Sequence, residues 1–253
     1  MRQELNTNFG LYAKLGRSFR LPNADELLSV QTPLQPQTST DKELGITWES
    51  DRYSARLAWF RYDLKNELLY NPLADGVWGP GTGANVNVDP TRRQGIEIEG
   101  RYALTKTLYL NANATWLQTK FRFGNYYGLD FRGNTVPPVP NWLVNAGLTW
   151  KPDYKWLMSV SAQYVGRACM DNDQANQFGE RLDDYLLFNG KTAYAFSPNV
   201  EGALAINNIF DKRYDSYGIR GNNAALKPLG SIAAYNLYPL PGRNFYASLT
   251  LRY

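Results

Sequence analysis

Eight residues in the long polar connections of this chain combine aromatic rings with guanidinium groups. Guanidinium groups pair with anions and stack on rings, so this combination suits an anionic chelate that is held by charge and stacking. The alternative for each residue is that it packs within its own loop or lies at a membrane interface. The eight candidate ligand-binding residues are Tyr70, Trp78, Tyr126, Tyr127, Phe131, Arg132, Arg167 and Arg181.

The rest of the composition removes most other site chemistry. The chain has no histidine, which excludes histidine-based triads and most zinc, copper and haem ligation. Cys169 is the one cysteine, so neither an intrachain disulfide nor a cysteine metal cluster can form. The Gly-x-Ser-x-Gly motif of serine hydrolases does not occur. We therefore expect no catalytic residue, no cofactor and no metal site.

A calcium site and a nucleic-acid partner are also disfavoured by the sequence. Residues 171–177 read DNDQANQ, but they lack the glycine and the terminal glutamate of an EF-hand calcium loop. We therefore expect a solvated loop there. The formal net charge is +4, and the cations are scattered among acidic residues. This distribution predicts no nucleic-acid partner.

The elements that must position these residues are predicted to be β-strands, and the last segment is the clearest. From Arg243 to Tyr253, an apolar face that includes Phe245 and Leu249 alternates with a polar face that includes Asn244 and Thr250. The apolar face continues for about 9 residues, roughly the length of a tilted strand that crosses a bilayer.

Similar alternation recurs about ten times, and three-residue turns alternate with long connections. Short turns on one side and long loops on the other are typical of outer-membrane barrels, whose polar faces line a wet interior. We therefore predict an all-β, antiparallel, up-and-down transmembrane β-barrel. The expected strands lie within residues 9–18, 44–48, 53–59, 94–102, 108–116, 142–150, 156–164, 186–194, 200–206 and 243–253.

The aromatic content supports a membrane interface. Aromatic residues make up 14% of the chain, and tryptophans near the strand ends suit the girdles of a membrane barrel. No apolar run approaches 18 residues, which excludes transmembrane helices, and the first residues lack the apolar core of a secretion signal. A soluble β-sandwich or propeller fragment is the alternative, and it would have to bury every apolar face in one core. The girdle tryptophans are Trp48, Trp59, Trp142, Trp150 and Trp156.

Five segments along the chain carry recognisable motifs. Residues 12–28 read YAKLGRSFRLPNADELL, and residues 34–48 read LQPQTSTDKELGITW. Further along the chain come RRQGIEIEGRYAL, LAINNIFDKRYDSYG and YNLYPLPGRNFYASLTLRY. In their sequence and order these segments resemble the barrel of TonB-dependent outer-membrane receptors of the iron-complex type, with Gln37 where that family has an acidic residue.

This resemblance implies that residues 1–253 are the C-terminal part of a roughly 22-stranded barrel, without the plug domain, its TonB box or a signal peptide. It also implies an outer-membrane location in a Gram-negative bacterium, contact with outer-membrane lipid, and TonB-dependent uptake of a ferric siderophore or similar anionic iron complex. TonB would act through the plug domain, and this chain would supply wall and ligand loops. Because histidine is absent, haem is disfavoured although the segment FRLP resembles one in haem receptors.

The resemblance also gives the C-terminus a role and leaves two other functions open. Tyr253, together with Phe245, resembles the signal read by the barrel-assembly machinery, with interfacial anchoring as the alternative. A complete ten-stranded barrel acting as a passive pore or structural protein would need residues 9–18 to pair with residues 244–253. A barrel protease would need an Asp-His pair that this chain cannot build, so we expect no enzyme.

Overall fold

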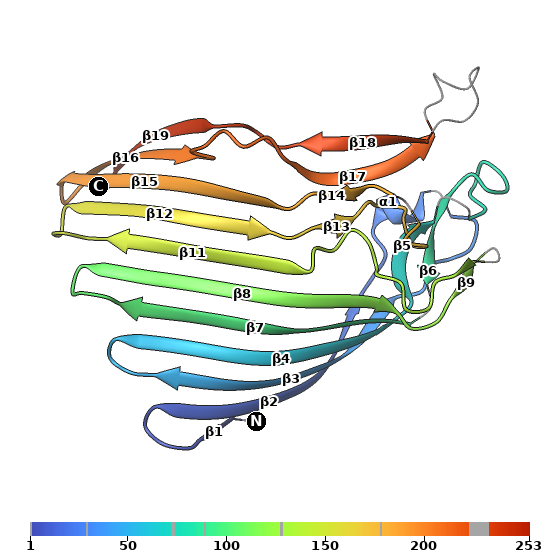
Figure 1. Ribbon diagram of the computed structural model, residues 1–253, viewed down its shortest axis with the longest axis horizontal. Coiled ribbons are helices and arrows are strands. Elements are labelled where there is room, and N and C mark those ends of the chain that lie inside the picture. The colour runs from blue at the N-terminus through green and yellow to red at the C-terminus, as the bar shows by residue number, and fades with distance from the viewer. Residues whose placement is uncertain are drawn as a thin grey trace.

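The computed structural model is dominated by one antiparallel sheet of eleven strands (Figure 1). It describes residues 2–28, 30–71, 74–88, 90–126, 129–177, 179–222 and 233–253. In sheet order the strands are β1(Arg2–Glu4), β2(Phe9–Arg20), β3(Gln37–Glu49), β4(Tyr53–Lys65), β7(Thr91–Ala103), β8(Leu108–Phe121), β11(Trp142–Trp150), β12(Trp156–Val165), β15(Tyr185–Ser197), β16(Val200–Asn207) and β19(Asn244–Leu251).

The all-β, up-and-down prediction is confirmed, because each strand of the sheet pairs with its neighbours along the chain. All ten expected strands are present, and β1 is an eleventh that the sequence did not predict. The long connections also contain structure that was expected to be loop. They hold the hairpins β5(Glu67–Asn71) with β6(Ala84–Val88), β9(Asn125–Tyr126) with β10(Leu129–Asp130), β13(Ala168–Cys169) with β14(Arg181–Leu182), and β17(Asp215–Asn222) with β18(Ala233–Pro239).

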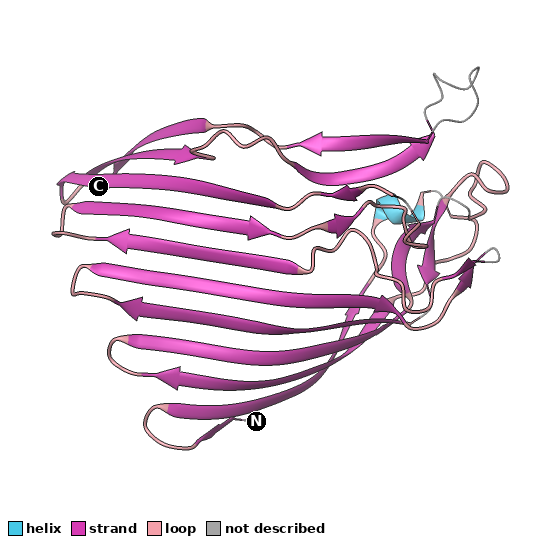
Figure 2. Cartoon of the chain, in the orientation of Figure 1, coloured by secondary structure: helices cyan, strands magenta, loops and turns pink. Residues whose placement is uncertain are grey.

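The short turns and the long connections lie at opposite ends of the sheet (Figure 2). Short polar side chains fix the tight turns: Asp153 Oδ1 accepts the backbone N–H groups of Lys155 and Trp156 at 2.8 and 2.9 Å. The first long connection carries the helix α1(Ala24–Leu27), which Asn23 and Glu26 close with a capping box. No helix of the described part of the chain is long and apolar enough to cross a membrane.

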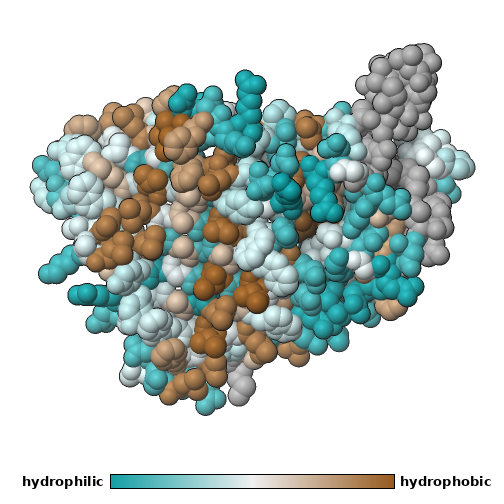
Figure 3. Space-filling model, in the orientation of Figure 1, coloured by the Kyte–Doolittle hydropathy of each residue, from teal (hydrophilic) through white to brown (hydrophobic). Residues whose placement is uncertain are grey.

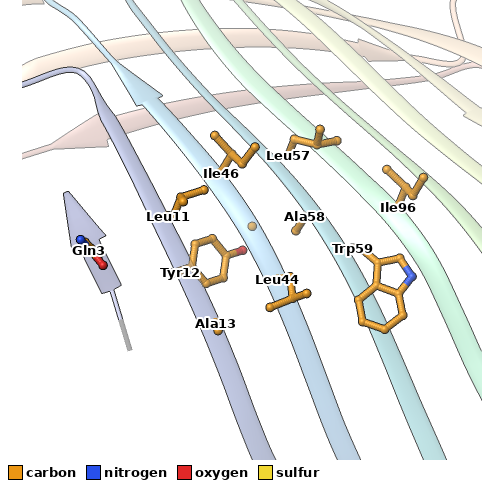
Figure 4. Close-up of a pocket in the computed structure, with 11 residues that line it drawn as sticks. Gln3, Leu11, Tyr12, Ala13, Leu44, Ile46, Leu57, Ala58, Trp59 and Ile96 are labelled. Carbon is orange, nitrogen blue, oxygen red and sulfur yellow. The ribbon is translucent and has the colours of Figure 1, made fainter. Parts of the chain in front are cut away.

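The strand register places the apolar side chains in continuous rows on one face of the sheet. Leu11 lies opposite Ile46, Ile46 opposite Leu57, and Leu57 opposite Ile98. Figure 4 shows the first three on adjacent strands, and all four are exposed. In the space-filling view, hydrophobic residues gather over the middle of the sheet (Figure 3). Such a large exposed apolar surface marks an interaction with a membrane or partner.

Aromatic side chains border the apolar band on two sides, toward the short-turn end and toward the loop end of the strands. At the short-turn end, Phe9 stacks on Trp48 with ring centroids 5.7 Å apart, and Trp48 contacts Tyr53 at 4.2 Å. At the loop end, Trp59, Trp116 and Trp142 belong to one cross-strand row, because each pairs with Ile96 or with the next tryptophan along that row. Rings at both borders of an apolar band are the arrangement of membrane girdles.

The sheet is open, with β1 and β19 as its two edges. Strand β2, which a closed ten-stranded barrel would pair with β19, pairs instead with β1 and β3. Among the described residues, β19 pairs with β16 alone. It ends beside the turn before β16, where the Arg252 N–H donates to the carbonyl of Asn199 at 2.9 Å. Strand β19 therefore ends at the short-turn end of the sheet.

Candidate functional site

The polar face of the sheet carries a charge network centred on Arg56 of β4. Its guanidinium lies 3.4 Å from the Glu43 carboxylate on β3, and 3.1 and 2.9 Å from those of Glu97 and Glu99 on β7. The Tyr12 hydroxyl on β2 donates to Glu43 at 2.6 Å and accepts from Arg56 at 3.0 Å. One cation thus holds three carboxylates and joins four strands.

Two rings on this polar face lie across glycines of the neighbouring strand. Tyr12 is directly opposite Gly45, where an added Cβ would lie 2.3 Å from the tyrosine ring. Phe60 is opposite Gly95, where an added Cβ would lie 2.7 Å from the phenyl ring. In Figure 4 the Tyr12 ring extends from β2 toward β3. The two glycines therefore leave space that the two rings fill.

A buried carboxylate fixes the base of the loop layer. Glu67, at the start of β5, is only 3% exposed. Its two carboxylate oxygens accept hydrogen bonds from the Thr91 hydroxyl and the Arg93 guanidinium, both on β7. A buried carboxylate is tolerated when it is paired in this way. The pairing ties the β5–β6 hairpin to the main sheet.

Amide side chains of residues 171–177 join three long connections. Gln174 donates to the Tyr70 carbonyl at 2.8 Å, and Asn134 donates to the Gln174 carbonyl at 3.1 Å. The Asn176 amide accepts from the Thr135 N–H at 2.6 Å and donates to the Thr135 carbonyl at 2.9 Å. This segment, expected to be a solvated loop, is a cross-link between loops that are distant in sequence.

Two apolar clusters support the same layer. Phe121 and Phe131 pack with ring centroids 5.6 Å apart, and Val88 and Val136 complete a buried cluster. A second cluster consists of Ala168, Met170 and Leu182, with Tyr235 packed against it. Both clusters are buried, whereas many large apolar side chains of the main sheet are exposed.

The β17–β18 hairpin docks on the β13 segment through Tyr217 and Asp171. The Tyr217 hydroxyl donates to the Asp171 carboxylate, and the Asp171 N–H donates to the Gly218 carbonyl at 2.8 Å. Burial, together with this hydrogen bond, raises the pKa of Tyr217 above its usual range. The nearby Cys169 is buried, and burial raises the pKa of its thiol. The thiol is therefore poorly reactive.

The carboxylates of residues 171–177 are engaged within the protein. Asp171 accepts from Tyr217, and Asp173, which is buried, accepts the Gln177 N–H at 2.7 Å. Within the described ranges, no three His, Cys, Asp or Glu side chains are placed to share a metal ion.

Five of the eight predicted ligand residues are exposed in the long connections. Tyr70 lies on β5 and Trp78, which is 85% exposed, lies between β5 and β6. The side chains of Arg132 and Arg167 are 68% and 67% exposed, and Arg181 on β14 is also exposed. The three connections that carry them, between β4 and β7, between β8 and β11 and between β12 and β15, lie at one end of the sheet (Figure 1).

Each of two exposed arginines already has a carboxylate partner. Arg132 contacts Asp130 at 3.5 Å, and Arg167 contacts Asp184 at 3.2 Å. Exposed pairs of this kind are weak, so an incoming anion can replace the carboxylate at small cost. These side chains can therefore receive a ligand without rearrangement of the buried clusters.

The other predicted site residues lie in different surroundings. Phe131 is 6% exposed and belongs to the buried cluster with Phe121, so its ring serves packing here. Tyr126 is the last residue of β9, and Tyr127 lies outside the described residues. Phe245 is exposed on the apolar face of β19, and Tyr253 is fully exposed beyond the end of that strand.

The Arg56 network was not predicted from the sequence, although a signal for it was present. On three successive strands of the sheet, a charged residue alternates with the apolar residues and so lies on the polar face: Glu43, Arg56 and Glu97. Aligning those strands by their apolar faces would have placed the three charges together.

Comparison with known proteins gives one consistent result. Residues 3–209 match the family model described as TonB dependent receptor-like, beta-barrel. The chain is 27% identical over 227 residues to the ferric enterobactin receptor PirA of Pseudomonas aeruginosa, covering 86% of this chain and 28% of that protein. It is 22% identical to the ferrienterobactin receptor of Escherichia coli K12, covering 99% of this chain and 34% of that protein. The chain thus spans about a third of these relatives.

Solved structures show the same fold. A mutant of the ferric enterobactin receptor of Pseudomonas aeruginosa superposes with a TM-score of 0.76 at 24% identity, over 99% of this chain and 39% of that one. The ferric yersiniabactin uptake receptor of Yersinia pestis superposes with a TM-score of 0.73 at 18% identity, over 99% of this chain and 36% of that one.

Proposed function

Because this chain belongs to the TonB-dependent receptor-like β-barrel family, we propose that it forms wall and extracellular loops of an outer-membrane receptor for a ferric siderophore or similar anionic iron complex. The observation that carries the proposal is the family match over residues 3–209. In this role the apolar face contacts lipid, the polar face lines the interior, and the long connections meet the ligand outside the cell.

The surfaces of the sheet support this orientation. Exposed apolar rows between two aromatic borders suit a bilayer, and the Arg56 network on the opposite face suits a hydrated interior. The long connections sit at one end and the tight turns at the other (Figure 2). We therefore assign the loop end to the outside of a Gram-negative cell and the turn end to the periplasm.

The loop chemistry supports an anionic ligand. The exposed guanidinium groups of Arg132, Arg167 and Arg181 and the rings of Tyr70 and Trp78 offer charge and stacking together. Relatives of this chain include receptors named for ferric enterobactin, an iron complex. We accordingly propose ferric siderophores as the ligand class and these five residues as contacts.

A closed passive pore is not the function that we propose. Such a barrel needs its last strand to pair with its first, whereas β1 and β19 are both open edges of the described sheet. Energy coupling in this family runs through a plug domain, so we expect residues 1–253 expressed alone to give no TonB-dependent uptake.

The test is growth on ferric enterobactin under iron limitation by a strain that lacks its own receptors. We expect a gene for a complete receptor that contains residues 1–253 to restore growth when TonB is present and not when TonB is deleted. A variant with Arg132→Ala, Arg167→Ala and Arg181→Ala should raise the iron-complex concentration needed for growth. The matched control replaces Arg52, Arg101 and Arg243 by alanine. Restored growth without TonB, or equal effects of both triple variants, would contradict the proposal.

A further inference from the structure

Six cations gather on the outer face of β2, β3, β4, β7 and β8, on the loop side of the apolar rows. They occupy the next cross-strand rows beyond the row that contains Leu44 and Trp59. Since opposed residues of antiparallel strands share a face, these cations share the face of the lipid-exposed rows. We call them the outer basic patch: Arg17, Lys42, Arg61, Lys65, Arg92 and Lys120.

The patch holds more positive charge than the protein neutralises. Asp63 is the one carboxylate in these rows, and it contacts Arg61 at 2.8 Å and Arg92 at 2.7 Å. No ion pair joins Arg17, Lys42 or Lys65 to any acid among the described residues. The local excess of cations therefore has no internal counter-charge.

The strand register places some of these cations directly opposite one another. Lys42 lies directly opposite Arg61, and Arg92 lies directly opposite Lys120. Like charges at directly opposed positions destabilise a sheet unless something neutralises them. Asp63 lies between the two pairs and contacts one arginine of each, whereas Lys42 and Lys120 have no carboxylate partner among the described residues. An anion that binds beside Asp63 would neutralise the remaining positive charge.

A groove in the patch gives the anion a place. Arg17, Thr40, Lys65 and Arg92 are among the residues that line it, and the exposed rings of Phe19 and Phe123 also contribute to its lining. The groove opens on the outer face, so it is separate from the interior network of Tyr12, Glu43 and Arg56 and cannot serve a ligand in the interior.

The neighbouring surface decides the kind of anion. The row that contains Lys42 and Arg61 lies two residues further along each strand than the row that contains Leu44 and Trp59. The distance between the two rows is therefore roughly 7 Å. A molecule with phosphates in the groove therefore places its apolar part on the exposed rows that carry Leu44, Ile46, Leu57 and Trp59 (Figure 4). A free anion would make no use of that surface.

From these observations we propose that the outer basic patch binds the phosphate-bearing head group of a lipid in the outer leaflet. The Arg17, Lys42, Lys65 and Lys120 side chains would supply point charges, and Arg92 would offer the guanidinium N–H groups that Asp63 leaves open. The acyl chains would lie along the apolar rows. The inference rests on the proposed outer-membrane location, because it needs that leaflet at the loop end.

The test measures lipid binding by native mass spectrometry of the full protein purified in detergent. The probes are diphosphoryl lipid A, the same lipid after removal of its phosphates, and inorganic phosphate. Each surface cation contributes about fivefold to binding of an anionic lipid surface, so Arg17→Glu, Lys42→Glu and Lys65→Glu together should weaken lipid A binding about 100-fold or more. Dephosphorylated lipid should bind weakly to both proteins.

The matched control reverses three exposed cations of the short turns, Arg52→Glu, Lys106→Glu and Lys151→Glu, and should bind lipid A as the parent does. Equal binding by the two triple variants, equal binding of the dephosphorylated lipid, or equal competition by inorganic phosphate would overturn the inference. Fractionation keeps this result apart from the proposed function: a parent protein outside the outer membrane refutes the location, whereas unchanged lipid binding within it refutes only the patch.

Discussion

The side chain of Asn176 pairs with the backbone of Thr135 as one strand pairs with another. Its amide accepts the Thr135 N–H at 2.6 Å and donates to the Thr135 carbonyl at 2.9 Å, although the two residues belong to different long connections. Asn176 has a positive φ of 53°, which asparagine tolerates. A second amide hydrogen of Asn176 bonds the Asp173 carbonyl, so the contact also holds its own loop.

The first prediction removes this contact without straining the backbone. Asn176→Gly keeps a residue that favours the left-handed region but deletes the amide, so local opening of the 171–177 segment becomes easier. The buried Cys169 reports this opening, and we expect its labelling by maleimide at fixed pH to accelerate about tenfold. Asn66→Gly, at an exposed asparagine with φ of 56°, should leave the rate unchanged. Equal rates in both variants would rule out the cross-link.

The second prediction concerns the rings that lie over glycines. Gly45→Ala places a Cβ 2.3 Å from the Tyr12 ring, which must swing away and lose its bonds to Glu43 and Arg56. We expect the free energy of unfolding to fall by about 1–3 kcal/mol. Gly16→Ala is the matched control, because nothing lies within 4 Å of its added Cβ. Chemical denaturation in detergent compares the two, and equal stability would contradict the packing argument.

These two contacts show where sequence reasoning succeeded and where it stopped. The alternation of apolar and polar residues predicted which side chains lie on which face in all ten strands, because this pattern depends only on neighbouring residues within each strand. The pairing of Tyr12 with Gly45 follows once the strands are aligned by their apolar faces. The Asn176–Thr135 contact has no local pattern, because two loops of different length meet in space. The β9–β10 and β13–β14 hairpins were missed because each of their strands has only two residues, too few to show an alternating pattern.

The candidate site divides in the same way. The sequence indicated that Trp78, Arg132 and Arg167 lie in loops, because they fall between the predicted strands. All three side chains are exposed in the structure. It did not foresee that Phe131 packs on Phe121, because an aromatic ring serves a buried cluster as well as a ligand surface.

The third prediction tests the Arg56 network. Arg56→Leu leaves Glu43, Glu97 and Glu99 close together without their cation, so repulsion between carboxylates should lower the free energy of unfolding by roughly 1–3 kcal/mol. Adding Glu97→Gln and Glu99→Gln should recover part of that loss. Arg101→Leu, on the same face and without an ion pair among the described residues, serves as control. A loss as large in the control would mean that the network contributes nothing specific.

The fourth prediction follows from the raised pKa of Tyr217. The folded protein holds the phenolic proton more tightly than the unfolded chain, so the stabilisation is fully present below about pH 10. It is lost as the pH rises from 10 through the higher folded pKa, when the phenolate would face the Asp171 carboxylate. Hydrogen exchange of residues 215–219, corrected for its intrinsic pH dependence, should show the β17–β18 hairpin weakening in that range. Tyr217→Phe should abolish the dependence, and a persistent dependence would assign it to another group.

The last prediction separates two roles for the terminal residue. Tyr253 is fully exposed beyond β19, so it contributes no packing to the described sheet. Deleting it should leave the thermal stability of assembled protein unchanged, whereas a role in assembly predicts a lower surface level. Replacing Tyr253 by phenylalanine keeps the ring and should restore that level, and replacing it by serine should not. If the deletion lowers the stability of the assembled protein but not its amount, the ring is an interfacial anchor and the assembly role is wrong.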